Sequence, residues 1–158
     1  MKMKGRIKAG EGSLIGNAGE YYVVAELLKQ GIVAALAPRN APSFDILATK
    51  NNKTVRIRVK TKSQEYSVWQ WAIKKDGAIF HNLSETEDYT VLVDLSMNTK
   101  DLNFYIVPTY QIDKWLKEDY EKWVKTPGKN NRPHDPANKQ RHLNQKKYGQ
   151  ELSNYLNQ

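Results

Sequence analysis

The chain has 158 residues and a mass of 18.2 kDa, a length that suits one domain with a packed core. It contains no cysteine, which excludes disulfides, a cysteine nucleophile and thiolate metal sites. Lys and Arg number 25 against 17 Asp and Glu, and the resulting formal net charge of +8 favours polyanionic partners, nucleic acid foremost.

The apolar runs of the sequence are short. The longest, residues 32–37, is far below the roughly 18 residues that a membrane-spanning helix needs. Polar residues follow the basic start of the chain, where the hydrophobic region of a signal peptide would stand. We therefore expect a cytoplasmic protein without a membrane segment.

The first part of the chain predicts a helix, a strand and a hairpin. Apolar residues recur at helical spacing over residues 14–30. Residues 32–37 are short and apolar, which predicts a buried strand. Residues 44–49 and 54–62 flank a two-residue turn at Asn51-Asn52 and predict a β-hairpin.

Three further strands are predicted at residues 69–73, 90–95 and 104–107, with polar turns between them. Pro108 and Thr109 are expected to end the last strand and to cap a helix. The apolar face of that helix is formed by Ile112, Trp115, Leu116, Tyr120, Trp123 and Val124.

The last part of the chain is polar and basic. Residues 126–149 nearly lack large aliphatic side chains, so we expect a segment that lies on the surface or is mobile, with a short helix over residues 150–156. The order of elements predicts an α/β fold, a central mixed β-sheet of about four to five strands flanked by helices. We expect one domain over residues 1–125, and a basic polar C-terminal extension over residues 126–158 that is packed on this domain or trails from it.

Hairpin register brings charged residues together. Pairing Lys50 with Lys53 across the turn places Asp45 directly opposite Arg58. Because side chains alternate between the faces of a strand, apolar residues then share one face of the hairpin and charged residues the other. The charged face carries Asp45, Arg56, Arg58, Lys60 and Lys62, and Glu20 on the first helix is placed to complete the group.

Three short segments carry a family resemblance: Gly19-Glu20, Pro42-Ser43-Phe44-Asp45 and Arg58-Val59-Lys60. Together they resemble the PD-(D/E)XK superfamily, the restriction-endonuclease-like fold that includes Holliday-junction resolvases. The resemblance covers residues 12–108 and leaves out the basic C-terminal segment. Phe44 stands where the pattern has proline before the aspartate.

This resemblance implies a metal-dependent DNA endonuclease that hydrolyses phosphodiester bonds. It implies that Glu20 and Asp45 hold Mg²⁺ or Mn²⁺ and that Lys60 supports the attacking water. Oxygen ligands suit such hard cations, and a nearby ammonium helps to ionise water and to neutralise the charge on phosphate. Many nucleases of this fold cut two strands as dimers, so the resemblance also implies a homodimer.

Arg58 departs from the family pattern, which has Glu, Asp or Gln two residues before the lysine. A guanidinium does not bind a cation, so the substitution removes a metal ligand. Gln64 and Glu65 are alternative donors further along the chain. Two other functions therefore stay open: a nucleic-acid-binding module that has lost cleavage, and an accessory protein that binds an acidic protein partner.

Nucleic acid, with DNA favoured over RNA, is expected to contact cationic and aromatic side chains. Ordinary structural roles compete with this interpretation. Glu20 also suits a solvated helix surface, Asp45 and Arg58 a cross-strand ion pair, and tryptophans on strands commonly pack in the core. The candidate nucleic-acid-binding residues are Arg56, Arg58, Lys62, Trp69, Trp71, Arg132, Lys139 and Arg141.

Overall fold

A five-stranded sheet forms the centre of the computed structural model, which describes residues 12–38, 41, 43–63, 68–95 and 102–156. The strand order is β1-β2-β3-β5-β6; β3 and β5 are parallel, and the other neighbouring strands are antiparallel. The predicted α/β fold with a mixed central sheet is confirmed. The strands are β1 (Val33–Leu36), β2 (Ile46–Lys50), β3 (Lys53–Lys62), β5 (Asp88–Asp94) and β6 (Asn103–Pro108).

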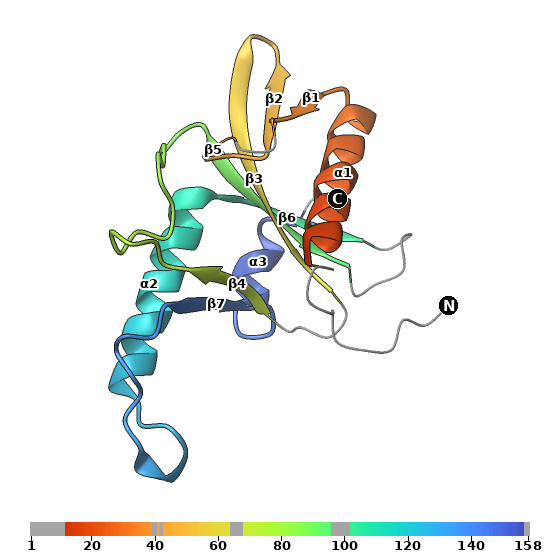
Figure 1. Ribbon diagram of the computed structural model, residues 1–158. Helices are drawn as coiled ribbons and strands as arrows, with labels where there is room; N and C mark the ends of the chain where they lie inside the picture. The colour runs from red at the N-terminus through yellow and green to blue at the C-terminus, as the bar shows by residue number, and fades with distance from the viewer. Residues whose placement is uncertain (1–11, 39–40, 42, 64–67, 96–101, 157–158) are drawn as a thin grey trace.

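Helices pack on both faces of this sheet (Figure 1). Helix α1 (Gly12–Lys29) belongs to a buried apolar cluster that includes Val91, whereas helix α2 (Thr109–Lys125) belongs to a second cluster that includes Leu92. Because adjacent residues of a strand point to opposite faces, the two clusters lie on opposite sides of the sheet. None of the described helices is both long and apolar enough to cross a lipid bilayer.

The register predicted for the β2–β3 hairpin is confirmed. Lys50 pairs with Lys53, and Ile46 pairs with Ile57. The two turn residues, Asn51 and Asn52, have φ angles of 51° and 62°, which a two-residue hairpin turn of this hand requires and asparagine tolerates.

A second, two-stranded sheet changes the expectation for the C-terminal part. Strand β4 (Val68–Ala72) pairs with β7 (Gln140–Asn144) and not with the central sheet. Within residues 126–149, expected to be mobile or merely to lie on the surface, Leu143 is fully buried, and so is Leu152 of helix α3 (Gly149–Ser153). A single aliphatic residue is enough to anchor a polar strand when its partner strand carries the aromatic residues of the core.

Two local predictions were wrong. Strand β1 is an edge strand rather than a buried one, and the side chain of Val33 is 65% exposed because only one side of β1 has a neighbouring strand. Thr109 does not cap α2, because the N-cap is Pro108. The Thr109 hydroxyl instead donates a hydrogen bond of 2.6 Å to Asp88 Oδ1.

Candidate active site

Asp45 closes the open edge of β3 at the point where β2 stops. Its backbone N–H donates to the carbonyl oxygen of Ile57 at 2.9 Å, one residue out of the β2–β3 register, in which Ile57 pairs with Ile46. Its carboxylate oxygen Oδ2 then accepts a 2.7 Å hydrogen bond from the backbone N–H of Val59. This bond satisfies a strand-edge donor and holds the carboxylate beside Lys60.

Burial shifts both members of the Asp45–Lys60 pair toward their neutral forms. Burial raises the pKa of Asp45, and the Val59 hydrogen bond and the charges of Arg58 and Lys60 oppose the shift. Burial also lowers the pKa of Lys60; the Asp45 charge opposes this shift, and the charge of Lys74 adds to it. A lysine that releases its proton more easily is suited to act as a base.

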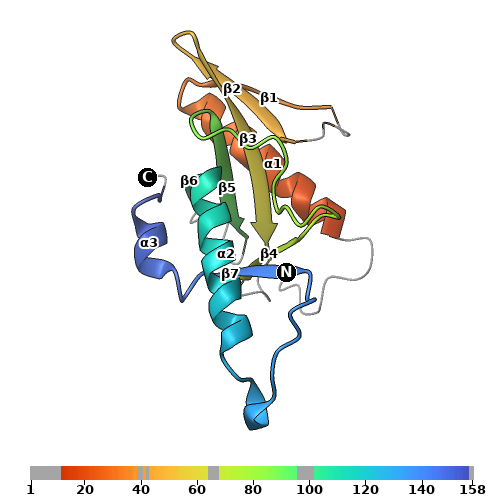
Figure 2. The ribbon, with the colours of Figure 1, turned by 90° about the vertical axis from the view of Figure 1, so that its left-hand side faces the viewer.

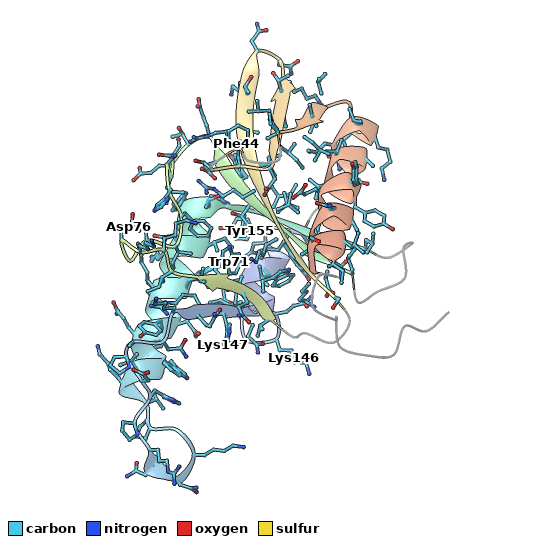
Figure 3. All side chains as sticks on the ribbon, viewed as in Figure 1. Phe44, Trp71, Asp76, Lys146, Lys147 and Tyr155 are labelled. Atoms are coloured by element: carbon cyan, nitrogen blue, oxygen red, sulfur yellow. The ribbon has the colours of Figure 1, made fainter. Side chains whose placement is uncertain are left out.

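Tryptophan and phenylalanine form one wall of this site. The Lys60 ammonium lies 5.4 Å from the ring centroid of Trp71, a partly exposed residue of β4 (Figure 3). Trp71 meets Phe80 edge to face, with ring centroids 6.1 Å apart. Because these rings displace water from the ammonium, they account for part of its burial.

Arg58 is paired with Asp88 rather than with Asp45. Its Nε donates to Asp88 Oδ1 at 2.9 Å and its Nη2 to Asp88 Oδ2 at 2.8 Å, while Nη2 also donates to the carbonyl oxygen of His81 at 2.8 Å. The two side chains are only 12% and 1% exposed. The expected cross-strand ion pair is thus replaced by a buried two-pronged bridge to the parallel strand β5.

Asp88 is the buried neighbour of the candidate site that sequence reasoning missed. Its carboxylate also accepts the Thr109 hydroxyl, which lies 2.9 Å from the hydroxyl of Thr90, and it is 3.7 Å from Nη2 of Arg56. Only the parallel pairing of β3 with β5 brings Asp88 opposite Arg56, and no sequence pattern reports that register. The bridge therefore joins β3, β5 and the start of α2.

Glu20 lies on α1 at the level of Lys60 but across the sheet from its side chain. A Cβ atom on Gly19 would lie 1.8 Å from Thr61 Oγ1, so the helix backbone is in direct contact with Thr61. Thr61 and Lys60 point to opposite faces of β3. Glu20 itself is partly buried.

Lys62 and Trp69 are part of the protein interior. Lys62 Nζ lies 2.9 Å from Asp94 Oδ1, and both side chains are 5% exposed. Trp69 is 1% exposed, and its indole N–H donates to the carbonyl oxygen of Val93 at 3.1 Å. These two residues were expected to contact nucleic acid, but as they stand in this structure no ligand can reach them.

The other candidate contact residues are more accessible. Arg56 and Trp71 are partly exposed, and Arg132 and Lys139 are exposed. The Arg141 guanidinium lies 3.4 Å from the ring centroid of Tyr120 and donates through Nη1 to the carbonyl oxygen of Asn138 at 2.6 Å.

The few carboxylates near Lys60 suit a metal ion that keeps most of its water ligands, rather than one that is coordinated mainly by protein side chains. Among the described residues, no group of three or more His, Asp or Glu side chains is placed to hold a metal ion, and Gln64 and Glu65 lie outside the described ranges. Mg²⁺ commonly retains several waters and binds one or two carboxylates together with phosphate oxygens. Asp45 offers one carboxylate of that kind, and Glu20, across the sheet, does not add a second on the same side.

Two nucleases are among the solved structures to which the chain has a distant structural similarity. No protein-family model matches the sequence, and the search of curated proteins finds no relative. The chain is similar to the bacterial homing endonuclease I-Ssp6803I, with 15% identity and a TM-score of 0.46 over 83% of this chain and 73% of that one. It is also similar to Hjc, a Holliday junction resolvase from the archaeal hyperthermophile Archaeoglobus fulgidus, with 14% identity and a TM-score of 0.47 over 90% of this chain and 98% of that one. At this level of superposition the two similarities carry no argument about family or activity.

Proposed function

We propose that this chain is a divergent PD-(D/E)XK protein that binds DNA and hydrolyses phosphodiester bonds as a metal-dependent endonuclease. The observation that carries the proposal is the half-buried pair of Asp45 and Lys60 where the β2–β3 hairpin ends. An acid and a base whose pKa values are both shifted by burial are typical of catalytic sites. The net charge of +8 suits a polyanionic substrate.

Lys60 has two roles in this proposal. Its lowered pKa increases the fraction of neutral amine, which accepts a proton from the attacking water. The resulting ammonium then lies beside the phosphate and offsets the negative charge that develops on its oxygens. Exposed Lys74, whose charge acts on Lys60, is placed to contact a neighbouring phosphate.

Asp45 is the proposed holder of Mg²⁺ or Mn²⁺, whereas Glu20, the second ligand that the resemblance implies, lies across the sheet from Lys60. When bound, such an ion supplies Lewis-acid stabilisation of phosphate oxygens and lowers the pKa of coordinated water. The bond from the Val59 N–H fixes one carboxylate oxygen of Asp45 and so orients the other. We further propose that the protein acts in the cytoplasm, on DNA rather than RNA, and as a homodimer when both strands are cut.

A second candidate function is DNA binding without cleavage. The buried bridge between Arg58 and Asp88 favours it, because it fills the position of a family metal ligand with a guanidinium that is already neutralised. In that case Asp45 and Lys60 stabilise the hairpin end, and the cationic surface alone holds phosphates.

One set of reactions separates the two functions. Supercoiled, linear, single-stranded and branched DNA, and RNA, are incubated with the protein and Mg²⁺ or Mn²⁺, and cleavage and binding are measured on the same samples. The endonuclease proposal predicts nicking that EDTA stops and that Asp45→Ala and Lys60→Ala abolish, while both variants still bind. Salt-dependent binding without any nicking supports the second function, and the absence of both overturns the two together.

A further inference from the structure

A rigid arm projects from the far end of α2. We define the arm as residues 126–139, which leave the helix and return to β7 (Figure 2). His134 of the arm stacks on Trp123 with ring centroids 4.0 Å apart and an interplanar angle of 19°, and Trp123 stacks on Tyr120 at 5.7 Å. The Tyr120 hydroxyl also donates a hydrogen bond to the carbonyl oxygen of Pro136. Stacking and hydrogen bonding therefore fix the arm to the helix.

The surface around the arm is strongly cationic. Between residues 122 and 147 the sequence has a single acidic residue, Asp135. Most of the cations of this stretch are exposed, so their charge is directed to solvent rather than to partners in the core. The exposed cations that form no ion pair with a described residue are Lys122, Lys125, Lys129, Arg132, Lys139 and Lys146, whereas Lys147, labelled with Lys146 in Figure 3, is ion-paired with Asp119 of α2.

Cations connect this surface to the candidate active site. Lys74 acts electrostatically on Lys60 and is exposed. Its neighbour Ile73 donates a backbone hydrogen bond of 2.9 Å to the carbonyl oxygen of Lys139, the last residue of the arm. A polyanion that contacts Lys60 and Lys74 therefore also reaches Lys139 and the cations of the arm.

Helix α2 spans the distance between the Arg58–Asp88 bridge, beside the candidate active site, and the start of the arm. Its first residue, Thr109, is hydrogen-bonded to Asp88, which is bridged to Arg58 beside the site. Its last residue, Lys125, adjoins the arm. A helix rises about 1.5 Å per residue, so these ends are about 24 Å apart, which corresponds to about seven base pairs of DNA.

The aromatic side chains of this region are already engaged within the fold. Tyr120 lies between the Arg141 guanidinium and Trp123, while Trp123 lies against His134 as well. Binding of single strands depends on aromatic faces on which bases stack. A rigid row of phosphate contacts instead suits a ligand that is itself rigid, because such a ligand loses little conformational freedom on binding.

We propose that the arm and the last turn of α2 are a second phosphate-contact surface, which holds double-stranded nucleic acid along a path from Lys74 and Lys139, beside Lys60, to the last turn of α2, about seven base pairs from the first turn of that helix. This inference rests on the proposed nucleic-acid binding and adds the substrate class. It does not depend on cleavage, since the contacts are made by residues outside the candidate active site.

The test is a binding titration of the full chain in EDTA, which prevents metal-dependent cleavage. Fluorescence anisotropy is recorded for a labelled duplex of about 24 base pairs and for its single strand, across a range of salt concentrations. The arm variant combines Lys129→Gln, Arg132→Gln and Lys139→Gln. The control variant loses the same charge at the opposite end of the molecule, through Lys29→Gln, Lys50→Gln and Lys53→Gln (Figure 1).

We expect the duplex to bind more tightly than the single strand. Each lost phosphate contact lowers the salt slope by about 0.9, so the arm variant should lose about two to three from the slope and about tenfold or more in duplex affinity. The control variant should stay near the wild type. Trp123→Ala, which keeps every charge but removes the stack, should weaken binding with little change of slope.

Two results overturn the inference. One is an arm variant that binds the duplex with wild-type affinity and slope, and the other is a single strand that binds as tightly as the duplex. A wild-type protein that binds neither nucleic acid at low salt overturns the proposed function itself. Circular dichroism melting of each variant shows that the compared proteins are folded.

Discussion

Replacing Arg58 with methionine tests whether its guanidinium belongs to the folded interior. The substitution keeps an unbranched apolar stem but removes the guanidinium, which leaves the Asp88 carboxylate, 1% exposed, without its two-pronged partner. It also removes the donor to the His81 carbonyl oxygen. Removing one member of a buried ion pair costs about 3–5 kcal/mol, a large part of the roughly 5–15 kcal/mol that stabilise an ordinary domain.

Urea denaturation followed by circular dichroism measures this loss. Arg56→Met is the matched control, because Arg56 stands two residues away on the same strand, is 29% exposed and lies 3.7 Å from the same carboxylate. It should cost about 1 kcal/mol or less. The double variant Arg58→Met/Asp88→Asn should recover part of the loss, since it removes the uncompensated charge. A cost below about 1 kcal/mol for Arg58→Met, or a double variant less stable than either single one, would refute the reasoning.

Three further outcomes test other contacts. Gly19→Ala should destabilise the protein by about 1–3 kcal/mol because the new Cβ meets Thr61 Oγ1 at 1.8 Å, and Thr61→Ala should restore part of the loss, as measured by urea denaturation. Leu143→Ala should cost about 2–5 kcal/mol, so a chain that ends at residue 125 should not fold cooperatively; a cooperative melt of that chain would contradict this. The raised pKa of Asp45 means that its contribution to stability is complete below its ordinary pKa of about 4 and is lost as the pH rises through the folded value. The free energy of unfolding of the wild type should therefore fall relative to that of Asp45→Asn over that pH range. If the difference between the two free energies does not change with pH, the pKa of Asp45 is not raised.

The hairpin could be predicted from the sequence because its information is local. The Asn51-Asn52 turn and the alternation on both sides of it determine the register, and this register alone places Asp45 next to the strand that carries Lys60. The positions of Asp45 and Lys60 could be predicted because they depend only on neighbouring residues within one hairpin.

The partner of Arg58 could not be predicted in the same way. Asp88 is 30 residues further along the chain and reaches Arg58 through a parallel strand, whose register depends on the packing of the whole sheet. For the same reason β7 was missed, because its pairing with β4 joins Trp69 to Leu143, which is 74 residues further along the chain. A polar sequence with one buried leucine has no periodicity that would reveal it as a strand.

Arg58→Glu illustrates how the structure changes the interpretation of the family pattern. Restoring an acidic residue at this position would place a second carboxylate against Asp88, in a site that excludes water. We expect this variant to be less stable than Arg58→Met and to gain no metal-dependent cleavage. Melting temperature and nicking rate, measured side by side, test both parts of the expectation.

The most direct test of the proposed active site is the rate at which Lys60→Met nicks supercoiled DNA in the presence of Mg²⁺. Loss of a positioned base typically lowers a rate by about 100- to 10,000-fold, and we expect a decrease in this range with the duplex affinity kept. Lys75→Met removes an exposed lysine of the loop after β4 that has no role in the proposal, and this variant should retain most of the activity. A Lys60→Met protein that nicks DNA at the wild-type rate would contradict the assignment of this site.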